Sequence, residues 1–146
     1  LLDLSQEPVR NYIKHMLHSY LKDGEIDYIK WDMNRPLTNV NSVLLDRNHK
    51  GETSHRYILG LYDILNWLKH TYPELLVEGC SSGGARFDPG MLYYVPQIWA
   101  SDNTDAYDRI SIQDGFSLLY PPSAISSHVS ITPNHQTGRF KSLETR

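Results

Sequence analysis

Short apolar segments alternate along this chain with longer segments whose apolar residues recur at helical spacing. The short segments cover residues 26–32, 75–78 and 98–101, and polar or glycine-rich residues follow each of them. Residues 5–24 and 53–73 carry apolar side chains three and four positions apart, as amphipathic helices do. Parallel strands need a crossover connection, usually a helix, so this order predicts an α/β fold with a parallel sheet.

Residue types at the segment ends set the expected boundaries of the first two helices. Ser5 is expected as the N-cap of the first helix, and Gly24 follows its end. Thr53 or Ser54 is expected to cap the second helix, which ends before Pro73. The strand at 26–32 is rich in β-branched and aromatic residues and is expected to be buried.

The remaining elements extend the same pattern without completing a barrel. A third helix is expected from Thr104 or Asp105 to Tyr120, and a weak strand over residues 124–129. About four strands are then present, whereas a complete (β/α)8 barrel has eight strands and roughly 250 residues. The 146 residues therefore predict one fragment of a domain with open sheet edges.

Composition and charge exclude several classes of partner. The formal net charge is −3 and no Lys/Arg block is present, so neither nucleic acid nor an anionic membrane is an expected partner. A neutral substrate fits this balance better. Cys80 is the only cysteine, which excludes an internal disulfide and favours a cytoplasmic location.

The beginning of the chain shows no export signal. It lacks a basic region followed by an apolar one, and no apolar stretch approaches membrane-spanning length. It also lacks an initiator Met and starts almost directly on a helix cap. We therefore expect an upstream part of the molecule to precede it.

Two carboxylates are expected at the same rim of the sheet. Asp32 ends the first short segment, the loop 80–84 follows the second, and Asp102 follows the third. Active sites of βα barrels form at the carboxyl ends of the strands, and glycoside cleavage needs a pair of carboxyl groups there. Lys30 projects to the same face as Asp32 and is placed to keep it ionised or to bind a sugar hydroxyl. The residue types alone are also compatible with a structural role, in which each aspartate is a helix cap or a loop residue.

Other side chains have structural interpretations of comparable weight. Trp31 and Trp99 are expected to pack in the core rather than to stack on sugar. Cys80 is either a small buried hydrophobe or a residue of the pocket. The histidines are scattered without metal-ligand spacing, so we expect neither a metal nor another cofactor.

Three motifs in this order resemble a known family. They are KWDMNR at 30–35, EGCSSGGARFD at 78–88 and WASDNTDA at 99–106, and the resemblance extends through 113–115 (QDG) and 120–122 (YPP). They are similar to motifs of the α-galactosidases of glycoside hydrolase family 36. The resemblance implies a (β/α)8 TIM barrel, of which residues 1–146 would cover roughly the third helix through the seventh strand.

The resemblance also implies roles for individual residues. Asp32 matches the nucleophile that forms a covalent galactosyl-enzyme, and Asp102 matches the general acid that later activates water. Substrate-binding roles are implied for four residues, namely Lys30, Asn34, Cys80 and Gly83. The family's further sugar contacts come from segments that precede the matched part, and this chain has no counterpart for them. 

The implied activity is that of an enzyme, a retaining α-galactosidase acting on melibiose- or raffinose-type oligosaccharides without a cofactor. Alternatives are a galactosyltransferase of raffinose-synthase type and a non-catalytic sugar-binding fragment. The resemblance further implies a homo-oligomeric, often tetrameric, parent protein.

Overall fold

The computed structural model describes residues 2–38 and 41–142, and its contacts divide the chain into two compact units. The first unit contains residues 1–29 and 35–76, and the second contains residues 30–34 and 77–146. No helix among the described residues is long and apolar enough to cross a membrane. The architecture is α/β, with helices and a small parallel sheet.

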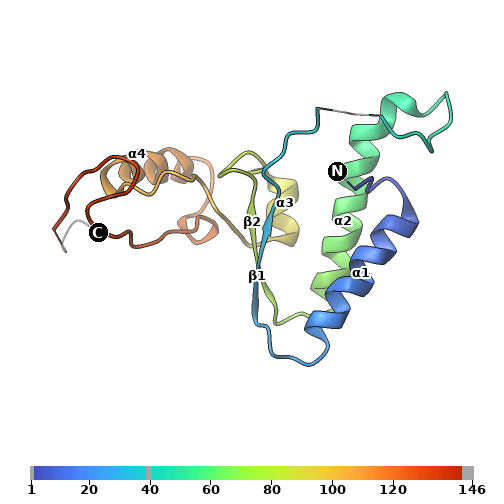
Figure 1. Ribbon diagram of the computed structural model, residues 1–146, viewed down its shortest axis with the longest axis horizontal. Coiled ribbons are helices and arrows are strands. Elements are labelled where there is room, and N and C mark those ends of the chain that lie inside the picture. The colour runs from blue at the N-terminus through green and yellow to red at the C-terminus, as the bar shows by residue number, and fades with distance from the viewer. Residues whose placement is uncertain (1, 39–40, 143–146) are drawn as a thin grey trace. The chain divides into compact units, whose positions relative to one another are not determined.

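Two helices that lie side by side form the first unit (Figure 1). They are α1 (Glu7–Leu21) and α2 (Thr53–Thr71), preceded by the short 3-10 helix η1 (Lys50–Glu52). Their buried apolar residues recur on one stripe of each helix, as the sequence predicts; they are Ile13, Leu21, Leu61, Ile64, Leu65 and Leu68. At the helix surface, Arg10 and Lys14 pair with Asp63 at 2.9 and 2.8 Å.

The expected N-caps of both helices are wrong in detail. Gln6 occupies the N-cap of α1 without a side-chain cap, and the Ser5 hydroxyl donates to Asp3 Oδ1 instead, at 2.6 Å. Thr53 is already inside α2, and its hydroxyl donates to the carbonyl of Lys50 at 2.8 Å. In each case the hydroxyl donates to an acceptor earlier in the chain and does not accept a hydrogen bond from the N–H groups of the first helical turn.

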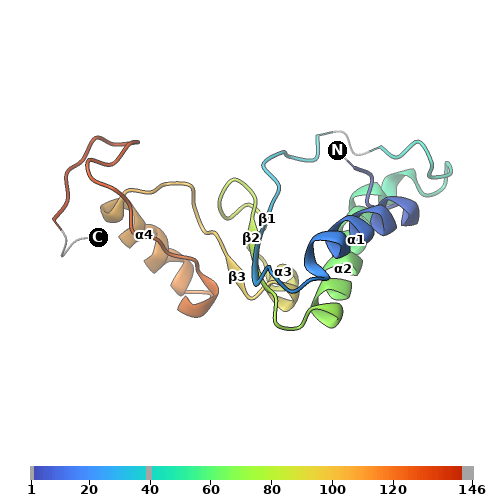
Figure 2. The ribbon, with the colours of Figure 1, turned by 60° about the horizontal axis from the view of Figure 1, so that its bottom comes forward.

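Three strands form the sheet in the order β1-β2-β3 (Figure 2). They are β1 (Tyr28–Asp32), β2 (Leu76–Cys80) and β3 (Gln97–Ile98), each within three residues of its predicted limits. Strand β2 pairs in parallel with β3, with Gly79 opposite Ile98. The parallel arrangement of the sequence prediction is therefore confirmed.

Two strand predictions differ from the structure. Strand β1 is half-exposed rather than buried, since it lies at the edge of the described sheet and its residues alternate between exposed and intermediate. The predicted strand at 124–129 is reduced to one parallel bridge between Ile98 and Ile125. It follows the 3-10 helix η2 (Pro122–Ala124), and a two-residue β3 offers little length for further pairing.

Two further helices in the second unit begin at aspartate caps. Asp88 caps α3 (Pro89–Tyr94), where its Oδ1 accepts from the N–H of Met91 at 3.0 Å. Asp105 caps α4 (Ala106–Ser117), which begins and ends within three residues of the predicted limits, and Asp105 is fully buried. Burial by itself would raise the pKa of Asp105. Hydrogen bonds from the Thr137 hydroxyl and from helix N–H groups, together with the charge of Arg139, outweigh it and lower that pKa.

At Gly60, α2 lies in close contact with the residues before α1. A Cβ at this position would lie 2.0 Å from the backbone oxygen of Leu4, which cannot rotate away. We expect Gly60→Ala to reduce the free energy of unfolding by about 1–3 kcal/mol, measured by urea denaturation of the intact protein. Gly115→Ala in α4 is the matched control, because a Cβ there meets nothing within 4 Å. Equal stability of the two variants would contradict this packing.

Asp105 predicts a pH-dependent contribution to stability. Its lowered pKa means that the contribution is present above the ordinary value of 3.8 and is lost as the pH falls through the folded-state value. We expect Asp105→Asn, which keeps a capping oxygen, to lower the melting temperature by several degrees at pH 7 and by less at pH 3. A difference that grows on acidification would refute this assignment.

Candidate active site

The two candidate catalytic aspartates and one candidate substrate-binding residue, Cys80, lie at or after the carboxyl ends of the strands. Asp32 is the last residue of β1, Cys80 is the last residue of β2, and Asp102 follows β3 by four positions. All three belong to the second unit. The strands that precede Asp32 and Asp102, β1 and β3, flank β2 on its two sides.

Asn34 connects Asp32 to the loop after β2. Its Nδ2 donates to Asp32 Oδ2 at 3.1 Å, and its Oδ1 accepts from the Ser82 N–H at 2.9 Å and from the Ser82 hydroxyl at 3.2 Å. Ser82 has a positive φ of 50°, an uncommon conformation for a residue other than glycine. The amide of Asn34 therefore holds both the carboxylate and this turn in place.

Two more hydrogen bonds join the same segments. The N–H of Met33 donates to the carbonyl of Cys80 at 3.1 Å, and the Ser81 hydroxyl donates to the carbonyl of Met33 at 2.7 Å. Both lie next to Asp32 and involve backbone groups. They restrict the position of Asp32 independently of its own side-chain contacts.

The buried thiol of Cys80 lies against Asp32. Burial raises the pKa of this thiol, the hydrogen bond with the Gly83 N–H opposes that effect, and the adjoining carboxylate of Asp32 raises the pKa further. The thiol therefore stays protonated and donates toward Asp32. Cys80 is thus both buried, at 5% exposure, and adjacent to Asp32, and its role in a pocket stays a prediction.

Gly83 and Gly84 bring the loop after β2 against the segment that carries Asp102. Gly83 has a φ of +85°, and a Cβ there would lie 2.8 Å from Ser101 Cα and 3.3 Å from the N atom of Asp102. A Cβ at Gly84 would lie 2.8 Å from the Ala100 oxygen. The close contacts of both glycines therefore include backbone atoms of residues 100–102.

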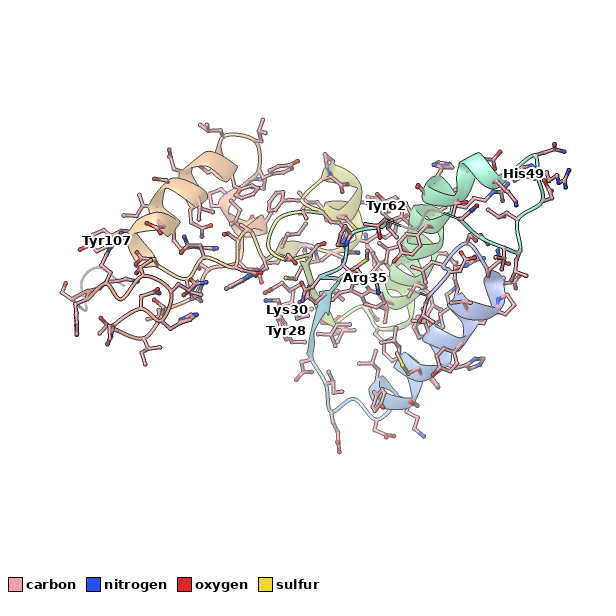
Figure 3. All side chains as sticks on the ribbon, turned by 45° about the horizontal axis from the view of Figure 1, so that its top comes forward. Tyr28, Lys30, Arg35, His49, Tyr62 and Tyr107 are labelled. Carbon is pink, nitrogen blue, oxygen red and sulfur yellow. The ribbon has the colours of Figure 1, made fainter. Side chains whose placement is uncertain are left out.

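Lys30 projects from β1 (Figure 3) and pairs with a buried acid that the sequence analysis did not single out. Its Nζ lies 3.3 Å from Oε1 of Glu78, whose side chain is only 8% exposed. The same ammonium group lies 4.1 Å from the centre of the Trp99 ring. Lys30 is therefore held by an anion and an aromatic face.

The carboxylate of Asp102 is bound by Trp99, which the sequence analysis assigned to the core. The indole N–H donates to Asp102 Oδ1 at 3.0 Å, and the tryptophan is only partly buried. Backbone contacts hold the same loop, since Gln136 Nε2 donates to the Asp102 carbonyl and Arg109 Nη1 donates to the Ser101 carbonyl. Glu78 and Trp99 each open one of the three sequence motifs, which is the signal that could have identified them.

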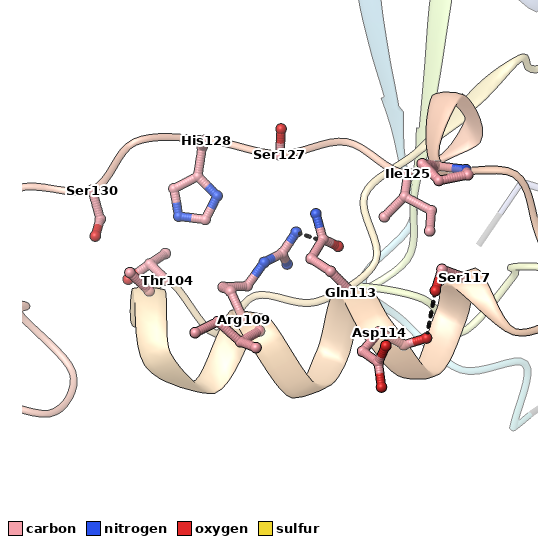
Figure 4. Close-up of a pocket in the computed structure, with 12 residues that line it drawn as sticks. Thr104, Arg109, Gln113, Asp114, Ser117, Ile125, Ser127, His128 and Ser130 are labelled. Carbon is pink, nitrogen blue, oxygen red and sulfur yellow. Dashed lines mark hydrogen bonds between the residues drawn. The ribbon is translucent and has the colours of Figure 1, made fainter. Parts of the chain in front are cut away.

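A pocket of about 540 Å³ lies between α4 and the segment after η2 (Figure 4). His128 and Arg109 point toward one another across it, and Arg109 donates to Gln113 at 3.2 Å. Burial and the positive charge of Arg109 lower the pKa of His128. None of the predicted site residues lines this pocket, but the His128 ring packs on Trp99 at 4.9 Å.

No group of three or more His, Cys, Asp or Glu side chains within residues 2–38 and 41–142 has the arrangement of a metal site. What the described residues bring together is a set of polar groups around two carboxylates. Such a set can act by nucleophilic attack and proton transfer.

Comparison with known proteins gives matches over the whole chain. The α-galactosidase 1 of Pediococcus pentosaceus is 57% identical over 146 residues, which is 100% of this chain and 20% of that protein. The α-galactosidase AgaA of Geobacillus stearothermophilus is 52% identical over the same length. This chain thus spans about one fifth of the length of these relatives.

Solved structures match equally well. The crystal structure of the family 36 α-galactosidase AgaA has a TM-score of 0.95 and 52% identity, and covers 99% of this chain and 20% of that one. Substituted forms of AgaA have been solved in complex with raffinose and with stachyose, with TM-scores of 0.95 and 0.94. The family model described as melibiase matches residues 1–146. The chain therefore belongs to the melibiase family, which includes the α-galactosidases of glycoside hydrolase family 36.

Proposed function

We propose that this chain is the central part of the catalytic domain of a retaining α-galactosidase. The domain would be a (β/α)8 barrel, with residues 1–146 supplying roughly its third helix through its seventh strand. The observation that carries the proposal is the placement of Asp32 and Asp102 after the two strands that flank β2. The relatives named as α-galactosidases, and the AgaA complexes with raffinose and stachyose, support melibiose- and raffinose-type substrates.

In the proposed first step, Asp32 attacks the anomeric carbon of the terminal α-galactosyl residue. The C1–O bond breaks as the bond to Asp32 forms, and Asp102 transfers its proton to the departing oxygen. In the second step, Asp102 removes a proton from water, which attacks C1 and releases Asp32. Two inversions give net retention, and the reaction consumes one water and needs no cofactor.

Of the four remaining predicted residues, Lys30 and Asn34 are proposed to bind galactosyl hydroxyl groups, and Cys80 and Gly83 to shape the pocket around the sugar. The ammonium of Lys30 and the amide of Asn34 are held by Glu78 and Ser82, so both are preorganised for a sugar. The protonated thiol of Cys80 and the backbone of Gly83 shape the floor of the site beside Asp32. Sugar contacts beyond these would come from other parts of the full-length protein.

The environment of the full-length protein follows from the same proposal. It would be a cytoplasmic homo-oligomer whose ligand is a neutral galactoside, with neither nucleic acid nor a membrane as partner. The net charge of −3 and the single cysteine support this setting.

The nucleophile assignment predicts a large loss of activity for Asp32→Ala. We expect kcat of the full-length enzyme toward an aryl α-galactoside to fall by at least about 1000-fold, because no covalent intermediate can form. Asp23→Ala removes an exposed aspartate of the first unit and is the matched control, with turnover unchanged. Normal turnover by Asp32→Ala would exclude Asp32 as the nucleophile.

The double-displacement mechanism predicts the configuration of the first product. We expect proton NMR, recorded before mutarotation equilibrates the sugar, to show α-galactose from an α-galactoside. Initial release of β-galactose would indicate single displacement by water, in which Asp32 acts as a base. The proposed galactosidase activity would then stand while the covalent role of Asp32 would not.

A further inference from the structure

The side chain of Trp99 donates a hydrogen bond to the carboxylate of Asp102. Its indole N–H donates to Oδ1 at 3.0 Å, which assigns one carboxylate oxygen to the protein. A proton carried by Asp102 is then favoured on Oδ2, since a protonated Oδ1 would be a poorer acceptor for the indole. The carboxyl group thereby gains a defined orientation for proton transfer.

The Trp99 ring is itself held by contacts on several sides. Lys30 Nζ lies 4.1 Å from the ring centre, the His128 ring lies 4.9 Å away, and the Arg109 guanidinium lies 5.3 Å away. These groups come from β1, from the segment after η2 and from α4. Cations that face the ring draw electron density from it and make its N–H a stronger donor.

The groups around Trp99 are fixed in turn by the rest of the second unit. The ammonium of Lys30 pairs with buried Glu78. Arg109 is 7% exposed, and its guanidinium donates to the carbonyls of Ser101 and Ser126 at 2.9 and 2.8 Å. The indole therefore has little freedom to turn away from Asp102.

We infer that Trp99 is a positioning residue for the acid/base step, which orients Asp102 so that Oδ2 presents the proton to the departing oxygen. This inference rests on the proposed function, because it assumes that Asp102 is the general acid. The proton leaves Asp102 Oδ2 and binds the glycosidic oxygen as the C1–O bond breaks. The N–H of Trp99 stays on the indole and stabilises the carboxylate that remains.

A positioning role in proton transfer predicts a dependence on the leaving group. Sugar leaving groups, as in melibiose, need the proton, whereas 2,4-dinitrophenolate departs without it. In the full-length enzyme, Trp99→Phe keeps an aromatic ring and removes the N–H. We expect kcat/KM for melibiose to fall about 10- to 100-fold, in line with the loss of a hydrogen bond to a charged group. The value for 2,4-dinitrophenyl α-galactoside should change by less than about 3-fold.

Two controls separate this role from a structural one. Trp67→Phe makes the same exchange in α2 of the first unit, where the indole packs on Tyr72, and should leave both substrates unaffected. Replacing Trp99 by benzothienylalanine, in which sulfur takes the place of the N–H, keeps the shape of the side chain should Trp99→Phe fold poorly. Retained activity toward the dinitrophenyl substrate reports an intact fold and a working Asp32.

The outcomes distinguish the inference from the proposed function. Asp102→Ala should show the same dependence on the leaving group in a stronger form. Suppose that Asp102→Ala shows this dependence. If both Trp99 replacements then lose activity equally toward the two substrates, or lose no activity toward either, the positioning role is refuted and the galactosidase assignment stands. If Asp102→Ala shows no such dependence, the assignment of the general acid is refuted together with the inference.

Discussion

Strand β2 contacts both segments that carry the candidate catalytic aspartates. On one side, the Cys80 carbonyl accepts from the N–H of Met33, next to Asp32. On the other side, the Gly79 carbonyl accepts from the backbone N–H of Trp99 at 2.8 Å, and Gly83 lies against the backbone of Ser101. Because Asp32 ends β1 and Asp102 follows β3, the two aspartates are far apart in the chain, and the central strand β2 is the element that contacts both of their segments.

The glycines after β2 explain why the loop after β2 lies so close to the segment that carries Asp102. A side chain at Gly83 would collide with backbone, and one at Gly84 with both backbone and the Phe116 ring, so the loop after β3 could not keep its present position. The positive φ of Ser82 between Cys80 and these glycines completes a turn that is held by Asn34. Strain in that turn is offset by hydrogen bonds made within the site.

Much of this arrangement could be predicted from the sequence because it depends on local patterns. Helical spacing located α1 and α2, and short apolar runs located β1 and β2. The N-cap at Ser5 was wrong because the competing acceptor, Asp3, is not distinguished by residue type from an ordinary neighbour. The predicted burial of β1 was wrong because whether a strand lies at the edge or in the centre of a sheet depends on strands elsewhere in the chain.

The sequence marks two candidate acids but not the side-chain contacts around them. Asp32 and Asp102 were predicted because strand ends and motifs mark them, and their catalytic roles stay predictions. The pairing of Lys30 with Glu78 and the hydrogen bond from Trp99 to Asp102 depend on side-chain directions across separate strands, which spacing in the sequence does not reveal. Membership of the melibiase family identifies the three motifs as motifs of that family, whereas the catalytic roles of the individual residues are proposals.

The side-chain amide of Asn34 has a consequence for chemical ageing of the protein. Its nitrogen faces Asp32 and its oxygen faces Ser82, so the two ends of one planar group serve opposite partners. Deamidation would exchange that nitrogen for oxygen with almost no change in size. The residue would then present a negative charge to the carboxylate that it now supports, so a change that leaves packing almost unaltered would act directly on Asp32.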